Sequence, residues 1–186
     1  MIWPWILAGI GVVLVILVIW VISSYNKLVQ LRNKAEDQWS QVDVQLKKRF
    51  DLIPNIVETV KGYAGHEKDT LQSVVEARNS ALSAATPDAE MHANQTLSGA
   101  LTKLFALSEA YPELKADRQF VELQKNLREV EDKIAYARQF YNDSVLTYKN
   151  ATETFPTNLV AKMFGFCAPQ FFEASDEEKS NVKVEF

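Results

Sequence analysis

The sequence has few of the residues that end helices or cross-link loops. Its 186 residues include six glycines, six prolines and a single cysteine, Cys167. So few glycines and prolines disfavour a β-rich fold with many turns and favour long helices. One cysteine excludes an intramolecular disulfide framework and a thiolate metal cluster. The composition therefore predicts an all-α protein without internal disulfides.

Charged side chains are absent from the beginning of the chain. No side chain from Met1 to Asn26 is charged, so all 20 Lys and Arg and all 24 Asp and Glu residues lie beyond it. These later charges are mixed in sign and nearly balanced, which argues against a general nucleic-acid binder. Residues 1–26 are therefore suited to an apolar environment, and the rest of the chain is suited to water.

The uncharged beginning has the length and composition of a membrane span. Residues 2–22 are mostly aliphatic and, as a helix, extend about 30 Å, the thickness of a bilayer core. Trp3 and Trp5 mark one interface, and Trp20 with Tyr25 the other. A cleaved signal peptide would carry a charged beginning and small residues at a cleavage site, so a retained anchor in the lipid bilayer is favoured.

The charges that flank the span predict its orientation. Lys27, Arg32 and Lys34 follow it, and only the amino terminus precedes it. The positive-inside rule therefore places a short amino terminus outside and the rest of the chain in the cytoplasm, as a single-pass protein.

Apolar residues after the span recur at spacings of three and four, which indicates amphipathic helices. The span continues in this pattern to Phe50, and a second helix is expected from beyond Pro54 to about Ala81. Thr86 is a predicted N-cap, with Pro87 at the first helical position. A third helix is then expected to end near 111–112. A fourth runs from Phe120 to before Phe155 with a heptad seam, and short connections make neighbours antiparallel.

The predicted organisation has three parts: a transmembrane anchor (1–24), an antiparallel four-helix bundle (25–155) and an aromatic C-terminal segment with an irregular acidic tail (156–186). The aromatic segment is too short and broken to span a membrane, so it folds over the bundle end or lies at an interface. The alternation at the end of the tail fits a short strand or, preferably, a frayed terminus. Four aromatic side chains are candidates for partner contact: Phe164, Phe166, Phe171 and Phe172.

Pro54 interrupts a long helical pattern. It lacks the N–H that would bond to the carbonyl of Phe50, and its ring clashes there, so we expect the chain to bend or reverse. The predicted hinge residues are Arg49, Asp51, Pro54 and Asn55. Arg49 would pair with Asp51 or a neighbouring acid, while Asn55 and Thr59 would satisfy freed backbone groups.

Lys47, Lys48 and Arg49 are three adjacent cations, which a helix spreads over most of its circumference, so they cannot all face a core. About 25 residues of upright helix would hold them roughly 40 Å from the bilayer, far beyond the Debye length. Lipid contact would therefore require the helix to fold down. Pairing at the hinge is favoured for Arg49, and Lys47 and Lys48 remain candidates for contact with a partner.

Residues with catalytic potential are isolated in this sequence. His66-Glu67 lacks the second histidine of a zinc-hydrolase helix, because Thr70 stands in its place, and His92 is distant. Cys167 has apolar neighbours, so a buried inert thiol is preferred over a lipid-attachment site. The mixed charges around Glu131 are typical of a solvated helix face. We expect no catalytic residues, no metal site and no cofactor.

Several segments resemble the LemA family of bacterial membrane proteins. They are Tyr25–Val29, Trp39–Asn55, Val57–Ala64 with His66-Glu67, Phe155–Leu159 and Phe164–Phe166. The resemblance covers nearly the whole chain, but Val182 stands where the family often has a proline. It implies a single membrane helix and a four-helix bundle in the cytoplasm at the bacterial inner membrane, without an established enzymatic activity. Some relatives resemble participants in the formation of membrane organelles such as the magnetosome.

Three functions follow as hypotheses. The favoured one is a non-catalytic, membrane-anchored scaffold or interaction module that forms a homo-oligomer. The second is an adaptor or regulator of another membrane protein, such as a protease or transporter. The third, an unrecognised hydrolase, would need a convergent polar pocket that the sequence does not indicate.

Overall fold

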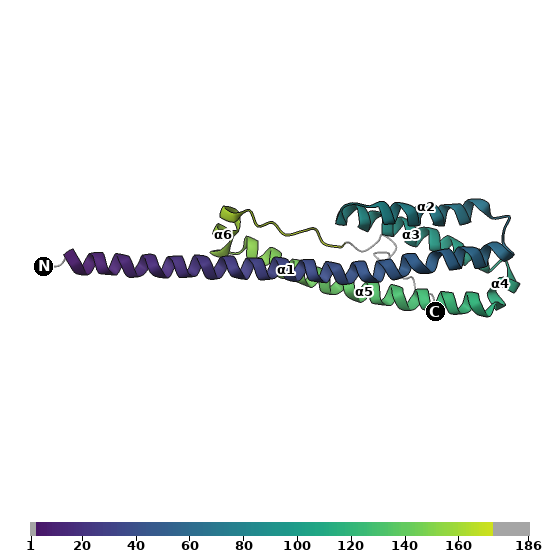
Figure 1. Cartoon of the computed structure of the whole chain (residues 1–186), viewed down its shortest axis with the longest axis horizontal. Coiled ribbons are helices and arrows are strands. Elements are labelled where there is room, and N and C mark those ends of the chain that lie inside the picture. Colours follow the sequence, from purple (N-terminus) through teal and green to yellow (C-terminus); the bar gives the residue numbers. More distant parts are fainter. Residues whose placement is uncertain (1–2, 173–186) are drawn as a thin grey trace, which may run out of the picture. The chain divides into compact units, whose positions relative to one another are not determined.

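The structure, a computed structural model, describes residues 3–172, and most of this part of the chain is helical (Figure 1). The all-α prediction is confirmed, and no strand occurs in this range. The alternating residues Val182, Val184 and Phe186 lie outside it. The helices are, in order, α1 (Trp3–Tyr63), α2 (Lys68–Ser83), α3 (Pro87–Ser108), α4 (Pro112–Ala116), α5 (Arg118–Glu153) and α6 (Thr157–Phe164).

Two compact units divide the chain, and α1 and α5 each contribute to both. The first unit comprises residues 1–40 and 139–171, and holds the apolar run, the last part of α5 and α6. Among the described residues, the second comprises 41–138 with Phe172. Its helices are the last part of α1, then α2, α3 and α4, and the first part of α5.

The core of the second unit follows the predicted apolar periodicity. On α5, the heptad positions from Phe120 to Ile134 are buried, as are Val42 and Leu46 on α1. The predicted start of the third helix is also confirmed, because Thr86 Oγ1 accepts a hydrogen bond from the backbone N–H of Ala89 at 3.2 Å. These helices bury one apolar stripe each, as a bundle requires.

Of the two outcomes expected at Pro54, a bend or a reversal, the reversal does not occur. Pro54 lies inside α1, which continues to Tyr63, and the chain turns at Ala64–Glu67 before α2 begins. Helix α2 is correspondingly shorter than the predicted second helix. All four predicted hinge residues therefore lie within a single helix, and Pro54 and Asn55 are exposed on it.

A side chain from α2 satisfies the carbonyl that Pro54 leaves without a donor. Pro54 has no N–H, so the carbonyl oxygen of Phe50 loses its partner within the helix. Arg78 Nε donates to this oxygen at 2.8 Å. The bond predicted from Thr59 exists, but Thr59 Oγ1 donates to the carbonyl of Asn55 at 2.8 Å, which is not the orphaned group. A charged donor from another helix thus allows α1 to continue through the proline.

Hydrogen bonds between side chains close one end of the second unit. Asp117 Oδ1 accepts from the backbone N–H of Phe120 at 2.8 Å at the start of α5, as a helix cap does. The other oxygen of Asp117 accepts from the hydroxyl of Tyr63, the last residue of α1, also at 2.8 Å. Tyr111 donates to Glu67 at 3.2 Å. These bonds join the turn between α1 and α2 to the residues just before and just after α4.

We expect Arg78→Met to destabilise the bundle, because it removes the donor to Phe50 while keeping an apolar stem. A hydrogen bond from a charged group contributes about 1.5–3 kcal/mol. In a Pro54→Ala background the loss should be smaller, since the new N–H at position 54 bonds to the same carbonyl. Thermal unfolding of all four combinations in detergent measures the difference. Equal losses in the two backgrounds would contradict the proposed role of Arg78.

The cap at Asp117 predicts a contribution to stability that acid removes. The hydrogen bonds from the Phe120 N–H and, second, from Tyr63 hold the pKa of the Asp117 carboxyl below its ordinary value. The contribution of the Asp117 carboxylate to the free energy of unfolding is therefore fully present above the pKa of this group in the unfolded chain, about 3.9. It is lost as the pH falls through the lower pKa of the folded state. We expect Asp117→Asn to flatten the acid limb of a stability–pH profile. An unchanged acid limb would refute this.

Candidate functional site

A buried arginine occupies the middle of the second unit. Arg49 on α1 is 0% exposed, and its guanidinium meets side chains of two other helices. Nη2 donates to Ser98 Oγ at 2.9 Å, and Nη1 lies 3.5 Å from Asn94 Oδ1, both on α3. Nε lies 2.9 Å from Glu131 Oε1 on α5, which forms an ion pair. One side chain thus connects α1, α3 and α5.

The neighbours of Arg49 are themselves held in place. Asn94 is buried and donates to the carbonyl of Glu90 at 2.9 Å, and Ser98 donates to the carbonyl of Asn94 at 3.0 Å. Burial lowers the pKa of Arg49 from its ordinary value, Glu131 opposes this effect, and Arg138 adds to it. An arginine nevertheless stays protonated in a protein. Glu131 therefore balances a permanent buried charge.

This geometry corrects two expectations. Asp51, one of the partners expected for Arg49 beside a neighbouring acid, does not pair with it, because Arg49 faces the core while Asp51 is exposed. Residues two apart on a helix point in different directions, so the acid must come from another helix. Glu131, predicted on a solvated face, is 39% exposed and turned toward Arg49.

An open groove lies between α1 and α5 within the same unit. It has a volume of about 330 Å³ and brings two predicted site residues, Lys48 and Asp51, together with residues of α5. Two side chains are cationic and two are acidic, and all four are exposed. The lining residues are Lys48, Asp51, Leu52, Asn126, Glu129, Val130 and Lys133. Lys47 is exposed but does not line the groove.

The apolar beginning of α1 is a candidate membrane span. The large aliphatic side chains from Ile6 to Ile19 are 50–61% exposed, and the most apolar stretch has a mean hydropathy of 3.0. Trp3, predicted at one interface, is exposed at the start of α1, where Trp5 also lies. A helix that exposes this much aliphatic surface is long and apolar enough to cross a bilayer.

The interface aromatics predicted at the other end of the run meet the C-terminal segment. Trp20 and Val21 pack against a cluster of Leu28, Tyr148, Val160 and Ala161. The ring of Tyr25 makes edge-to-face contacts with Phe164 and Phe166, with ring centroids 4.9 and 5.4 Å apart. Helix α6 therefore folds onto α1 just where the apolar run ends.

The remaining predicted contact residues differ in exposure. Lys149 Nζ lies 5.5 Å from the ring centroid of the half-buried Phe171, in the first unit. In the second unit Arg138 covers the ring of Phe172 at 4.1 Å, and Phe172 is only 4% exposed. Phe172 is therefore a buried side chain, not the surface contact that the sequence suggested.

The residues considered for chemistry remain apart. His66 and His92 are both exposed, and residues 3–172 contain no group of three or more metal-ligating side chains. The expectation of a buried thiol at Cys167 is wrong, because Cys167 is exposed. Its neighbours Phe166 and Ala168 pack against the buried cluster of the first unit, while Cys167 between them is exposed.

The buried ion pair can be tested by removing one partner. Glu131→Ala leaves the Arg49 charge without its counter-ion, and we expect a loss of about 3 kcal/mol in unfolding free energy, at the low end for buried pairs because Glu131 is partly exposed. The double variant Arg49→Met, Glu131→Gln should lose less, since it leaves no unpaired charge. Glu122→Ala, at an exposed acid of α5 that does not line the groove, is the control. Urea unfolding followed by circular dichroism measures each; wild-type stability of Glu131→Ala would contradict the pairing.

Comparisons with known proteins identify a family for this chain. The LemA family profile matches residues 38–186. Protein LemA of Metamycoplasma hominis is 25% identical over 161 residues, which cover 84% of this chain and 72% of that protein. Magnetosome protein MamQ of Magnetospirillum gryphiswaldense is 24% identical over 174 residues, and MamQ 2 of Paramagnetospirillum magneticum is 23% identical over 175. Each match covers 80% of this chain and 64% of the relative, slightly less than two thirds of its length.

The family match covers most of the chain. It includes residues 41–138 of the second unit, with the buried Arg49 and its partner Glu131, and residues 38–40 and 139–171 of the first unit, and it begins after the apolar run. The resemblance predicted from the sequence segments is thereby confirmed. The chain belongs to the LemA family.

Proposed function

We propose that this protein is a non-catalytic scaffold, anchored in the bacterial inner membrane by the apolar run of α1 and self-associating through its cytoplasmic bundle. The anchor is supported by the exposed aliphatic surface of α1 and by its mean hydropathy. The cytoplasmic side is supported by the cations Lys27, Arg32 and Lys34 that follow the run. The magnetosome proteins among the relatives fit a role in organising a membrane compartment.

The observation that carries the proposal is the charge pattern of the groove between α1 and α5. Lys48 and Lys133 stand beside Asp51 and Glu129, so each sign occurs twice around an apolar floor that includes Val130. A two-fold dimer contact brings the same patch of both subunits together, so the patch must be complementary to itself. A patch with two lysines and two acids meets that requirement, whereas a patch of one sign would repel its copy.

Rigidity supports the same surface as an interface. Lys48 precedes the buried Arg49, and Glu129 lies two residues before its counter-ion Glu131. The groove is therefore built on two helices that are tied to each other in the core beneath it. Contact residues on rigid elements lose less conformational entropy on association than those on loops.

Charge exchange tests self-association at this groove. We expect Lys48→Glu with Lys133→Glu to dissociate the oligomer, because four acids on each copy would then face four on the other. Asp51→Lys with Glu129→Lys should dissociate it for the opposite reason. Mixing the two variants should restore a heterodimer, since their patches are complementary. Sedimentation in mild detergent, with one variant carrying a mass tag, measures all three.

A matched control and a clear refutation are available. Lys103→Glu changes an exposed lysine of α3 that does not line the groove, and should leave the oligomer unchanged. A wild-type protein that sediments as a monomer would refute the scaffold. Oligomers that survive both double variants would show that self-association uses another surface, and crosslinking in native membranes would then test the adaptor alternative.

A further inference from the structure

Helix α6 has an outer stripe of apolar side chains that nothing in the chain covers within the described residues. Leu159 and Met163 are 53% and 70% exposed, and Phe155, just before the helix, is 75% exposed. Leu159 and Met163 are four residues apart on α6, so they fall on one side of the helix, whereas Phe155 lies in the turn that precedes it. The opposite face, with Val160 and Ala161, is buried. The segment is thus amphipathic, with its outer face apolar.

The buried face of α6 fixes where this stripe lies along α1. Val160 and Ala161 share a cluster with Leu28, and Trp20 and Val21 pack against it. Trp20 and Val21 belong to the last turns of the apolar run, and Leu28 lies two turns beyond its end. The outer face of α6 is therefore beside the boundary at which α1 passes from apolar to polar residues.

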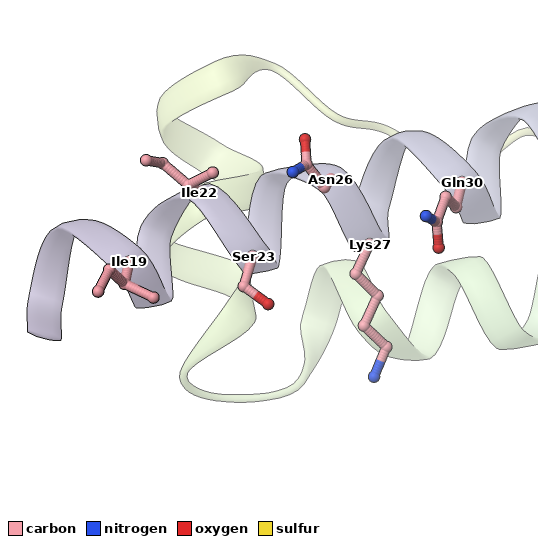
Figure 2. Close-up of a pocket in the computed structure, with 6 residues that line it drawn as sticks. All are labelled: Ile19, Ile22, Ser23, Asn26, Lys27 and Gln30. Carbon is pink, nitrogen blue, oxygen red and sulfur yellow. The ribbon is translucent and has the colours of Figure 1, made fainter.

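Another face of α1 shows the same boundary directly. An open groove of about 620 Å³ is lined first by Ile19 and Ile22 and then by polar residues beginning at Ser23 (Figure 2). In Figure 2 the side chain of Lys27 extends from the helix just beyond this change. A lysine at this position reaches the headgroups while its stem stays against apolar surface. The lipid–water boundary on α1 therefore falls near 22–23.

We propose that the outer stripe of α6 (Leu159 and Met163), with Phe155 in the turn before the helix, inserts into the interfacial layer of the bilayer that α1 crosses, as a second membrane contact. The inference rests on the proposed anchor. The stripe continues the lipid-exposed surface of the apolar run at the depth of headgroups and first acyl carbons, where amphipathic helices lie. Lys162, exposed on α6, fits the same layer because it carries the charge that anionic headgroups attract.

This contact would give the first unit a defined depth and rotation in the membrane. One helix can slide and turn in a bilayer, but a second apolar contact held rigidly beside it removes that freedom. The edge-to-face contacts of Tyr25 with Phe164 and Phe166 hold α6 to α1, and Arg32 lies 5.7 Å from the ring centroid of Phe166. The inserted stripe is therefore part of the folded unit and not a loose tail.

Spin labels on the full-length protein test the insertion. In a Cys167→Ser background, single labels are placed at Leu159→Cys and Met163→Cys, both exposed positions. The protein is reconstituted in vesicles of phosphatidylethanolamine and phosphatidylglycerol. Power saturation then compares collisions with oxygen, which concentrates in lipid, and with a water-soluble nickel chelate. We expect both labels to favour oxygen at least several-fold more than a label at Asp143→Cys, an exposed polar position on α5.

A label at Val13→Cys in the apolar run separates the possible failures. If it favours oxygen while the labels at 159 and 163 favour the nickel chelate, the anchor holds and the insertion of α6 is overturned. If the labels at 159 and 163 are shielded from both reagents, a protein surface covers the stripe, which also overturns it. If the label at Val13 itself favours the chelate, the anchor fails, and the insertion fails with it.

Discussion

The bundle depends on neutralising one charge in its core. Arg49 is fully buried on α1, and an arginine cannot shed its proton to escape the low dielectric. Glu131 must therefore be held at the same height on α5, and Asn94 and Ser98 at the same height on α3. An apolar stripe alone would allow helices to slide by a turn. A buried ion pair with directed hydrogen bonds selects one register, because any other leaves the charge without partners.

One residue after Arg49, a second polar group of α1 needs a partner from another helix: the backbone carbonyl of Phe50. Pro54 removes the donor for the carbonyl of Phe50, and Arg78 of α2 supplies the replacement. Consecutive residues Arg49 and Phe50 thus tie α1 to three other helices, one through a side chain and one through a carbonyl. A proline that would end an isolated helix becomes tolerable because the tertiary structure provides the missing hydrogen bond.

The features that could be predicted from the sequence are those that depend on residues close together in it. The heptad on α5 and the cap at Thr86 depend on residues a few positions apart, and both were predicted correctly. The continuation of α1 through Pro54 was not predicted, because Arg78 is 28 residues from Phe50 and no local rule connects them. Pairing Arg49 with Asp51 failed for the same reason. A charged residue in register with the apolar positions Leu46 and Ile53 was the signal that Arg49 faces the core.

Adjacent residues of α1 therefore serve opposite purposes. Lys48 and Arg49 are neighbours in the sequence, but a rotation of about 100° per residue puts one in the groove and the other in the core. On α5, Glu129 lines the groove, whereas Glu131, which is partly exposed, turns toward Arg49. The groove residues Lys48 and Glu129, which would contact a partner, are therefore close in sequence to Arg49 and Glu131, whose ion pair sets the register of the helices. A change of register in the core would consequently displace the groove, and with it the surface that we propose for self-association.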